Sequence, residues 1–254
     1  DWSSDVCSSD PRMAALRLAL VSFLLAAGAA LAQDKPAERH PDVIFVPTPQ
    51  EVVEDMLRLA NVKAGDVLYD LGSGDGRIVF TALRANAKAR GIGVDIDEKL
   101  VRESNADAKK FGMADRVQFH MRDVFDTDLK PATVITMWLW PEMQRMLRTK
   151  ILAEARPGTR VVSHLFDMGS WSPDAADPGR QAIRLWIVPA RVEGNWTWTV
   201  PFRGVERRFD AVLEQRFQSV EGVFRTDDRR REIRDMVLKG DRLSFSLSLQ
   251  ADGG

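Results

Sequence analysis

The chain has 254 residues, of which 44% are hydrophobic and 29% are charged, as in an ordinary folded protein. This length accommodates one large domain, or a domain with an accessory part. With 36 basic and 37 acidic residues the net charge is −1, so charge does not indicate binding to nucleic acid or to an anionic membrane.

The N-terminal part differs in character from the rest. Residues 1–12 are rich in serine and aspartate and precede a methionine, so we expect them to be an artefact. Residues 13–32 have the form of a secretory signal peptide, with a basic start, an uncharged run and the cleavage pattern Ala30-Leu31-Ala32. Residues 33–42 predict a flexible leader. We therefore expect export to a bacterial periplasm, or tethering to the membrane if the segment is not cleaved.

The chain has few cysteine and histidine residues that could serve in catalysis or metal binding. The only cysteine, Cys7, lies in the segment predicted to be an artefact, so we expect no disulfide, thiolate nucleophile or cysteine metal site. His40 and His120 have no partner at metal-ligand spacing, and no metal site is expected. His164 could act as a base or be a structural part of a buried strand.

The first element predicted after the leader is a helix. Thr48 is a candidate N-cap, Pro49 then occupies the first helical position, and Glu51 follows three residues after the cap. The buried face of this helix is predicted from helical spacing to consist of Val52, Val53, Met56, Leu57 and Ala60.

A glycine-rich turn follows. The apolar strand 67–70 ends at Asp70, enters the loop 72–76 and leads into a helix over 77–86. Glycine lets the backbone approach a ligand closely, but the dinucleotide fingerprint would need glycine at 77, where the chain has Arg77. A carboxylate at Asp70 would repel a pyrophosphate and attract an ammonium or sulfonium. The turn therefore favours S-adenosylmethionine (SAM) over NAD.

Two further strands end in aspartate. Strand 91–95 ends at Asp95, 25 positions after Asp70 and near the offset of about 20 at which an acid binds ribose hydroxyls. Strand 116–121 leads to Asp123, which could accept a hydrogen bond from an adenine amino group. Aspartate is common at strand ends, so the ordered set with the glycine loop is more specific than any member.

Strands and helices continue to alternate up to residue 190, which predicts a Rossmann-like, doubly wound, mostly parallel α/β sheet over 43–190. From 191 to 254 the pattern alternates polar and apolar residues between turns, and predicts a small antiparallel β extension. Its mixed run Arg229–Arg234 indicates a solvated strand face. The other predicted elements are helix 97–111, strand 132–138, helix 141–155, strand 159–165, a loop over 167–180 and a strand at 182–188.

These motifs resemble class I SAM-dependent methyltransferases. Residues 43–188 resemble the small lysine N-methyltransferases of the ATP synthase c subunit and the adenine nucleotide translocase, with their bacterial relatives, and more distantly Dot1-type enzymes. The cofactor motifs are specific, and the substrate motifs are much less so. The segments that carry the resemblance are Val46–Pro49, Tyr69–Ile78, Gly158–His164 and Phe166–Gly169.

The resemblance implies SAM as cofactor and a role for each matching position. Asp70 would hold the methionine ammonium, and the loop Gly72-Ser73-Gly74 would let the backbone pass close to the ligand. Asp95 would bind the ribose hydroxyls. Asp123 would bind the adenine amino group, with Val124 giving backbone contacts. Thr48 would reach the cofactor carboxylate, although a plain N-cap is the equal alternative.

The acceptor side is less specific. The segment Thr136–Glu142 lacks the Asn/Asp-Pro-Pro-aromatic box of adenine-N6 and glutamine methyltransferases. In the group it resembles, this strand end flanks the acceptor channel, where Trp138 and Trp140 could line a slot for an alkylamine or simply pack in the core. Glu142 and Asp167 are weak candidates for taking up the amine proton, since each could be a solvated or capping acid.

The sequence therefore predicts SAM-dependent methylation of a protein lysine, with no nucleic-acid partner. Methylation of a small molecule or lipid is the alternative within enzymes. A non-catalytic exported binding protein that retains the fold is another, because SAM is made in the cytosol. In a third alternative, residues 191–254 bind a partner while the α/β part acts as a scaffold.

Overall fold

The computed structural model describes residues 45–177, 179, 182–202, 204–226 and 229–248. The predicted artefact, signal peptide and leader, together with Cys7 and His40, lie outside these residues. Among the helices of the described part, none has the length and apolar character needed to span a bilayer.

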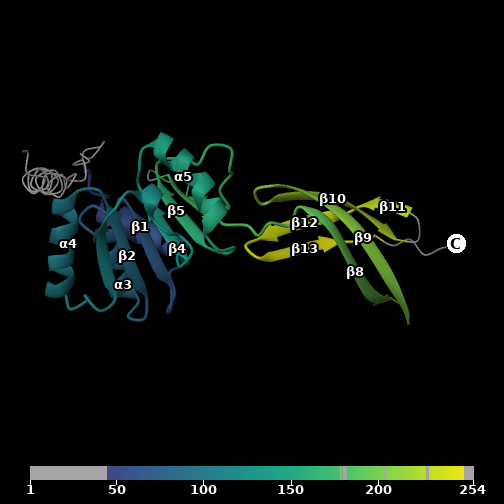
Figure 1. Ribbon diagram of the computed structural model, residues 1–254, viewed down its shortest axis with the longest axis horizontal. Coiled ribbons are helices and arrows are strands. Elements are labelled where there is room, and N and C mark those ends of the chain that lie inside the picture. Colours follow the sequence, from purple (N-terminus) through teal and green to yellow (C-terminus); the bar gives the residue numbers. More distant parts are fainter. Residues whose placement is uncertain (1–44, 178, 180–181, 203, 227–228, 249–254) are drawn as a thin grey trace, which may run out of the picture. The chain divides into compact units, whose positions relative to one another are not determined.

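The main sheet has seven strands in the order β3-β2-β1-β4-β5-β7-β6. The first five strands of this order, β3, β2, β1, β4 and β5, run parallel to one another. At the edge, β7 pairs antiparallel with β5, and β6 pairs antiparallel with β7. The predicted mostly parallel, Rossmann-like sheet is thereby confirmed (Figure 1). Its strands are β1 (Val67–Leu71), β2 (Arg90–Asp95), β3 (Val117–Met121), β4 (Val134–Met137), β5 (Arg160–His164), β6 (Ala175–Asp177) and β7 (Ile183–Ile187).

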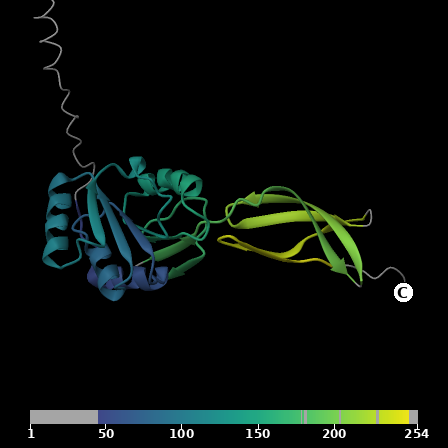
Figure 2. The ribbon, with the colours of Figure 1, turned by 60° about the horizontal axis from the view of Figure 1, so that its bottom comes forward.

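Helices cover both faces of this sheet, as two views show (Figures 1 and 2). One buried cluster joins α2, α3 and α4 to side chains such as Leu68 and Val134. A second joins α5 to the alternate residues Tyr69 and Ile135 of the same strands. This alternation follows from the period of two along a strand. The helices are α2 (Gln50–Ala60), α3 (Arg77–Ala85), α4 (Glu98–Lys110), the 3-10 turn η1 (Val124–Asp126) and α5 (Pro141–Glu154).

Two local predictions are wrong. Helix α2 begins at Gln50 with Pro49 as its N-cap, and no side chain caps it, so Thr48 is not the cap. The Pro49 carbonyl accepts the Val52 and Val53 amides instead. Within the predicted loop 167–180, residues 175–177 form β6, because the edge of β7 supplies backbone partners that no local pattern encodes.

The C-terminal strands form two antiparallel sheets, which confirms the predicted β extension. One has four strands in the order β11-β10-β9-β8, and the other pairs β12 with β13. Their shared core includes Phe209, Phe224 and Leu238. The division of the chain at residue 190 stays a prediction. The strands are β8 (Gly194–Phe202), β9 (Val205–Arg216), β10 (Ser219–Thr226), β11 (Arg229–Glu232), β12 (Arg234–Lys239) and β13 (Arg242–Ser246).

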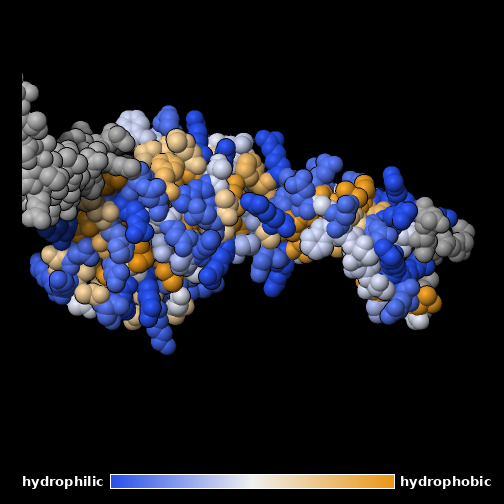
Figure 3. All heavy atoms as spheres, in the orientation of Figure 1, coloured by the Kyte–Doolittle hydropathy of each residue, from blue (hydrophilic) through white to orange (hydrophobic). Residues whose placement is uncertain are grey.

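On the face drawn in Figure 3, charged and polar residues dominate, with smaller hydrophobic areas between them. The four residues of β11 are mostly exposed, as expected for a solvated strand face.

Candidate functional site

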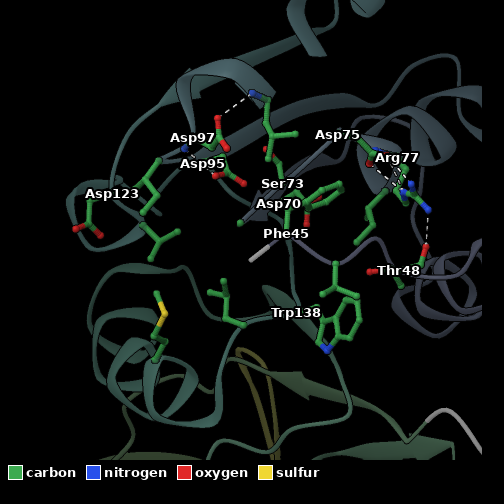
Figure 4. A pocket seen from close by; sticks show the side chains of 18 of the residues that line it. Phe45, Thr48, Asp70, Ser73, Asp75, Arg77, Asp95, Asp97, Asp123 and Trp138 are labelled. Atoms are coloured by element: carbon green, nitrogen blue, oxygen red, sulfur yellow. Dashed lines mark hydrogen bonds and ion pairs between the residues drawn. The ribbon is translucent and has the colours of Figure 1, made fainter. Parts of the chain in front are cut away.

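A cavity of about 770 Å³ lies at the carboxyl ends of the parallel strands. Its wall is contributed by the segment before α2, the glycine loop after β1, the residues after β2, β3 and β4, and the first turns of α5 (Figure 4). This is the place where open α/β sheets bind their ligands, and the volume suits a nucleoside-sized molecule. The predicted cofactor residues that line it are Thr48, Asp70, Gly72, Ser73, Asp95, Asp123 and Val124.

The glycine loop has little room for side chains. Gly72 and Gly74 have φ values of +79° and +53°, which disfavour any other residue. A Cβ at Gly72 would lie 2.6 Å from Leu139 Cδ2, and one at Gly74 would lie 2.1 Å from Phe45 Cε2. Gly74 does not line the cavity itself. The loop therefore needs glycine because two cavity-lining side chains pack directly against it.

Asp70 is a buried carboxylate with incomplete hydrogen bonding. Its Oδ1 accepts a bond of 2.8 Å from Thr136 Oγ1, while its Oδ2 has no partner among the described residues. Burial raises its pKa from 3.8 to about 7, against the lowering effect of the Thr136 bond and with a smaller contribution from Asp95 and Asp75. The nearby Ser73 Oγ is also buried and without a partner among these residues. A cationic hydrogen-bond donor in the cavity would satisfy this carboxylate.

The other two strand-end aspartates are oriented by backbone amides. Asp95 accepts bonds from the Gly74 amide through Oδ2 (2.8 Å) and from the Asp97 amide through Oδ1 (3.0 Å). Asp123 accepts a bond of 2.9 Å from the Phe125 amide and is the N-cap of η1. A carboxylate has about four lone-pair sites, so Asp95 can still accept bonds from ligand hydroxyls.

The opposite wall is apolar. It is formed by Trp138 and Leu139 after β4 and by Met143 and Met146 of α5. In Figure 4, Trp138 lies across the cavity from Asp70 and Ser73. The Trp138 ring lies 4.9 Å from the ring of the buried His164, whose Nδ1 has no partner among the described residues. Burial lowers the pKa of His164, so the neutral imidazole is favoured.

A buried polar contact fixes this apolar wall. Gln144, fully buried in α5, donates from Nε2 to the Leu139 carbonyl at 2.8 Å. Ser163 Oγ on β5 donates to Gln144 Oε1 at 2.7 Å. The end of β4 is thus tied to both α5 and β5, which sets the position of Trp138 and Leu139.

Three predicted acceptor-side residues do not line the cavity. Trp140 is 56% exposed at the N-cap of α5, and Glu142 is exposed in the first turn. The helical repeat turns Met143 and Met146, three positions apart, toward the cavity and leaves Glu142 outside. Asp167 is exposed, accepts the Gly169 amide at 2.8 Å and pairs with Arg145 at 3.8 Å. It therefore orders its own loop and does not face the cavity.

Comparison with known proteins identifies the family. The model of the ANTKMT methyltransferase domain matches residues 70–175. A protein-lysine N-methyltransferase of Saccharolobus islandicus is 42% identical over 133 residues, which cover 52% of this chain and 83% of that protein. The chain belongs to the ANTKMT methyltransferase family. This methyltransferase is therefore an enzyme, as the resemblance predicted.

Other relatives match the same part of the methyltransferase. The adenine nucleotide translocase lysine N-methyltransferase of Mus musculus is 31% identical over 60% of this chain and 65% of its own length. A solved structure of an RNA methyltransferase from Salinibacter ruber, in complex with S-adenosyl-L-homocysteine, has 47% sequence identity and a TM-score of 0.56. That match covers 58% of this chain and 96% of the solved chain.

Several cavity residues of this methyltransferase were missed by sequence reasoning. Phe45, Asp75 and Arg77 line it near the glycine loop, and Met143 and Met146 line it from α5. The departure from the dinucleotide fingerprint at Arg77 was a usable signal. For the methionines there was none, because apolar residues on a helix equally predict core packing.

Proposed function

We propose that this protein is a SAM-dependent methyltransferase that methylates the Nε atom of lysine in a protein. The observation that carries the proposal is Asp70, a buried carboxylate with an oxygen that lacks a partner among the described residues, at the bottom of a cavity whose far wall is apolar. An ammonium next to Asp70 would supply the missing hydrogen-bond donor on one side of the cavity. An alkylamine against Trp138 would fit the apolar side.

The residues around the cavity fit the cofactor. Asp70 would accept a hydrogen bond from the methionine ammonium, and Asp95 would accept bonds from the ribose hydroxyls. Asp123 and Val124, at the far end of the line of aspartates, would hold the adenine. Thr48, buried and facing the cavity, would donate to the cofactor carboxylate. When bound, SAM supplies a methyl group activated by a positively charged sulfur.

On the acceptor side, the chain positions the amine, and the apolar wall of Trp138, Leu139, Met143 and Met146 contains no acid or base. The aliphatic part of a lysine would lie along Leu139 and Met143, with its nitrogen at the face of Trp138. The acceptor must lose a proton before it can attack a methyl group. Glu142 and Asp167 lie outside the cavity, and the aspartates that line it belong to the proposed cofactor side. The proposal therefore passes this proton to water and assigns much of the rate to positioning.

A second acceptor class, RNA, has one observation in its favour, the name of the Salinibacter ruber relative. The electrostatics of this chain favour lysine. The cavity is lined by Asp70, Asp75, Asp95, Asp97 and Asp123, and its arginine, Arg77, is paired with Asp75. An acidic cavity repels phosphates. Export of the chain stays a proposal that rests on the pattern of residues 13–32.

The test is a methylation assay with the full chain, methyl-labelled SAM and a bacterial extract separated into protein and RNA fractions. We expect label in the protein fraction, recovered as Nε-methyllysine after hydrolysis, and its loss with the Asp95→Ala variant. Label recovered only in RNA would overturn the lysine assignment and retain the cofactor assignment. Label in neither fraction, with SAM bound, would point to a small molecule or lipid acceptor. A folded protein that does not bind SAM would contradict the proposal as a whole.

A further inference from the structure

Arg77 stands where a dinucleotide-binding loop would have glycine. Its side chain contacts both Asp75, in the glycine loop, and Thr48, in the segment before α2. We propose that Arg77 is a positioning residue that fastens the segment 45–48 against the glycine loop and thereby retains the cofactor. The inference rests on the proposed cofactor and goes beyond it, because it assigns the retention of that ligand to a residue that need not touch it.

The guanidinium is held in one orientation by its neighbour. Arg77 Nε donates to Asp75 Oδ1 at 2.9 Å and to Oδ2 at 3.0 Å, and Nη2 donates to Oδ2 at 2.5 Å. A fork of this kind fixes the plane of the guanidinium. The remaining nitrogen, Nη1, is thereby directed at the Thr48 carbonyl, to which it donates at 2.9 Å. Figure 4 shows this chain of contacts from Asp75 through Arg77 to Thr48.

The segment 45–48 needs such an anchor. Its C-terminal end is fixed, because α2 begins at Gln50 and buries one face in the core. Toward its N-terminal end, Phe45 and Val46 are 41% and 58% exposed, so burial alone holds them weakly. Phe45 nevertheless packs on Gly74, and both Phe45 and Thr48 line the cavity. The bond from Arg77 holds the backbone of this segment at Thr48 and so sets the direction in which the chain runs from α2 back to Phe45 and the glycine loop.

The Asp75–Arg77 pair contributes little to global stability. Its side chains are 38% and 32% exposed, and ion pairs at such positions are largely screened by water. Loss of the pair should therefore leave the fold intact while it releases the segment from the glycine loop. We expect the cofactor then to dissociate faster, because segment 45–48 no longer completes the wall of its site.

The experiment compares S-adenosylhomocysteine binding by the full chain and its Arg77→Met variant, with calorimetry for affinity and stopped-flow for dissociation. We expect affinity to fall about tenfold, mainly through faster dissociation, as befits one lost charge-assisted hydrogen bond. The Michaelis constant for SAM should rise while kcat stays within about twofold, and Arg77→Lys should restore part of the affinity. Arg84→Met is the matched control, since Arg84 lies on the same helix and faces Phe111, outside the cavity wall.

Asp75→Asn separates this role from direct pairing of Arg77 with the cofactor carboxylate. If Arg77 acts through the segment, Asp75→Asn weakens binding, because the guanidinium loses its orientation. If Arg77 pairs with the cofactor itself, removing the competing Asp75 charge tightens binding, and the inference is overturned.

Phe45→Ala should also weaken binding of S-adenosylhomocysteine. The double variant Phe45→Ala with Arg77→Met should bind no more weakly than Arg77→Met alone. Unchanged affinity in Arg77→Met, with the wild type binding normally, sinks only this inference, whereas a wild type that does not bind contradicts the proposed function.

Discussion

The two walls of the cavity are held in place by different means. On one side, Asp70, Asp95 and Asp123 lie at or just after the carboxyl ends of three parallel strands, and backbone amides or Thr136 orient their carboxylates. On the other, the residues that line the described cavity are apolar, and the buried Gln144 fixes them through the Leu139 carbonyl. The acidic wall suits a fixed cationic ligand, whereas the apolar wall can admit different alkylamine acceptors.

The largest expected effect is in the glycine loop, beside the acidic wall. Gly74→Val should lower the affinity for S-adenosylhomocysteine at least about 100-fold, because it combines strain at a positive φ with a clash against Phe45. Gly112→Val is the matched control, since Gly112 also has a positive φ but a Cβ there would meet no atom of the described residues within 4 Å. Calorimetry of both variants measures the difference. Normal binding by Gly74→Val would show that the loop does not shape the cofactor site.

The acidic wall should be sensitive to single charges. Asp95→Ala should weaken S-adenosylhomocysteine binding by about 1–3 kcal/mol, because it removes the ribose acceptor and the support for the Gly74 amide. Asp95→Asn, which can keep a bond to that amide, should lose less. The exposed Asp115 provides a control through Asp115→Ala. Equal affinity in all three variants would remove Asp95 from the site.

The raised pKa of Asp70 predicts two pH dependences of opposite sign. The ionised carboxylate binds an ammonium, so cofactor affinity should rise with pH by up to about tenfold per unit below its pKa of about 7. The stability of the protein without cofactor should change in the other direction. The contribution of neutral Asp70 is fully present below pH 3.8 and is lost as pH rises through about 7. Calorimetry and thermal unfolding across this range measure both, and Asp70→Asn should abolish both.

The smallest effect on the cofactor is expected from the apolar wall. Gln144→Leu leaves the Leu139 carbonyl and the Ser163 hydroxyl without this partner, and should cost about 1–3 kcal/mol of stability. The Michaelis constant for the acceptor should rise severalfold, while S-adenosylhomocysteine affinity changes by less than about twofold. Gln118→Leu, at an exposed position on β3, is the control. A large loss of cofactor affinity would show that the walls are not independent.

Sequence reasoning correctly placed together the side chains whose position depends on where a strand ends. Asp70, Asp95 and Asp123 lie at or just after the carboxyl ends of their strands, and the carboxyl ends of parallel strands meet at one edge of a sheet. An alternating strand–helix pattern is therefore enough to bring these three carboxylates together. The glycine requirement at 72 and 74 was likewise predicted from the chain, although the side chains that impose it, Leu139 and Phe45, come from distant segments.

Contacts between segments far apart in the chain were decided by the tertiary structure alone. Thr48 carries the residue type of a helix cap, yet its carbonyl is bound by Arg77 and its side chain faces the cavity. The phase of α5 against the sheet determines that Met143 faces the cavity and Glu142 does not. Residue type and local pattern determine which elements form and where they end. Which side chains share a cavity depends on how the elements pack, because packing free energy comes from partners that no local window of sequence contains.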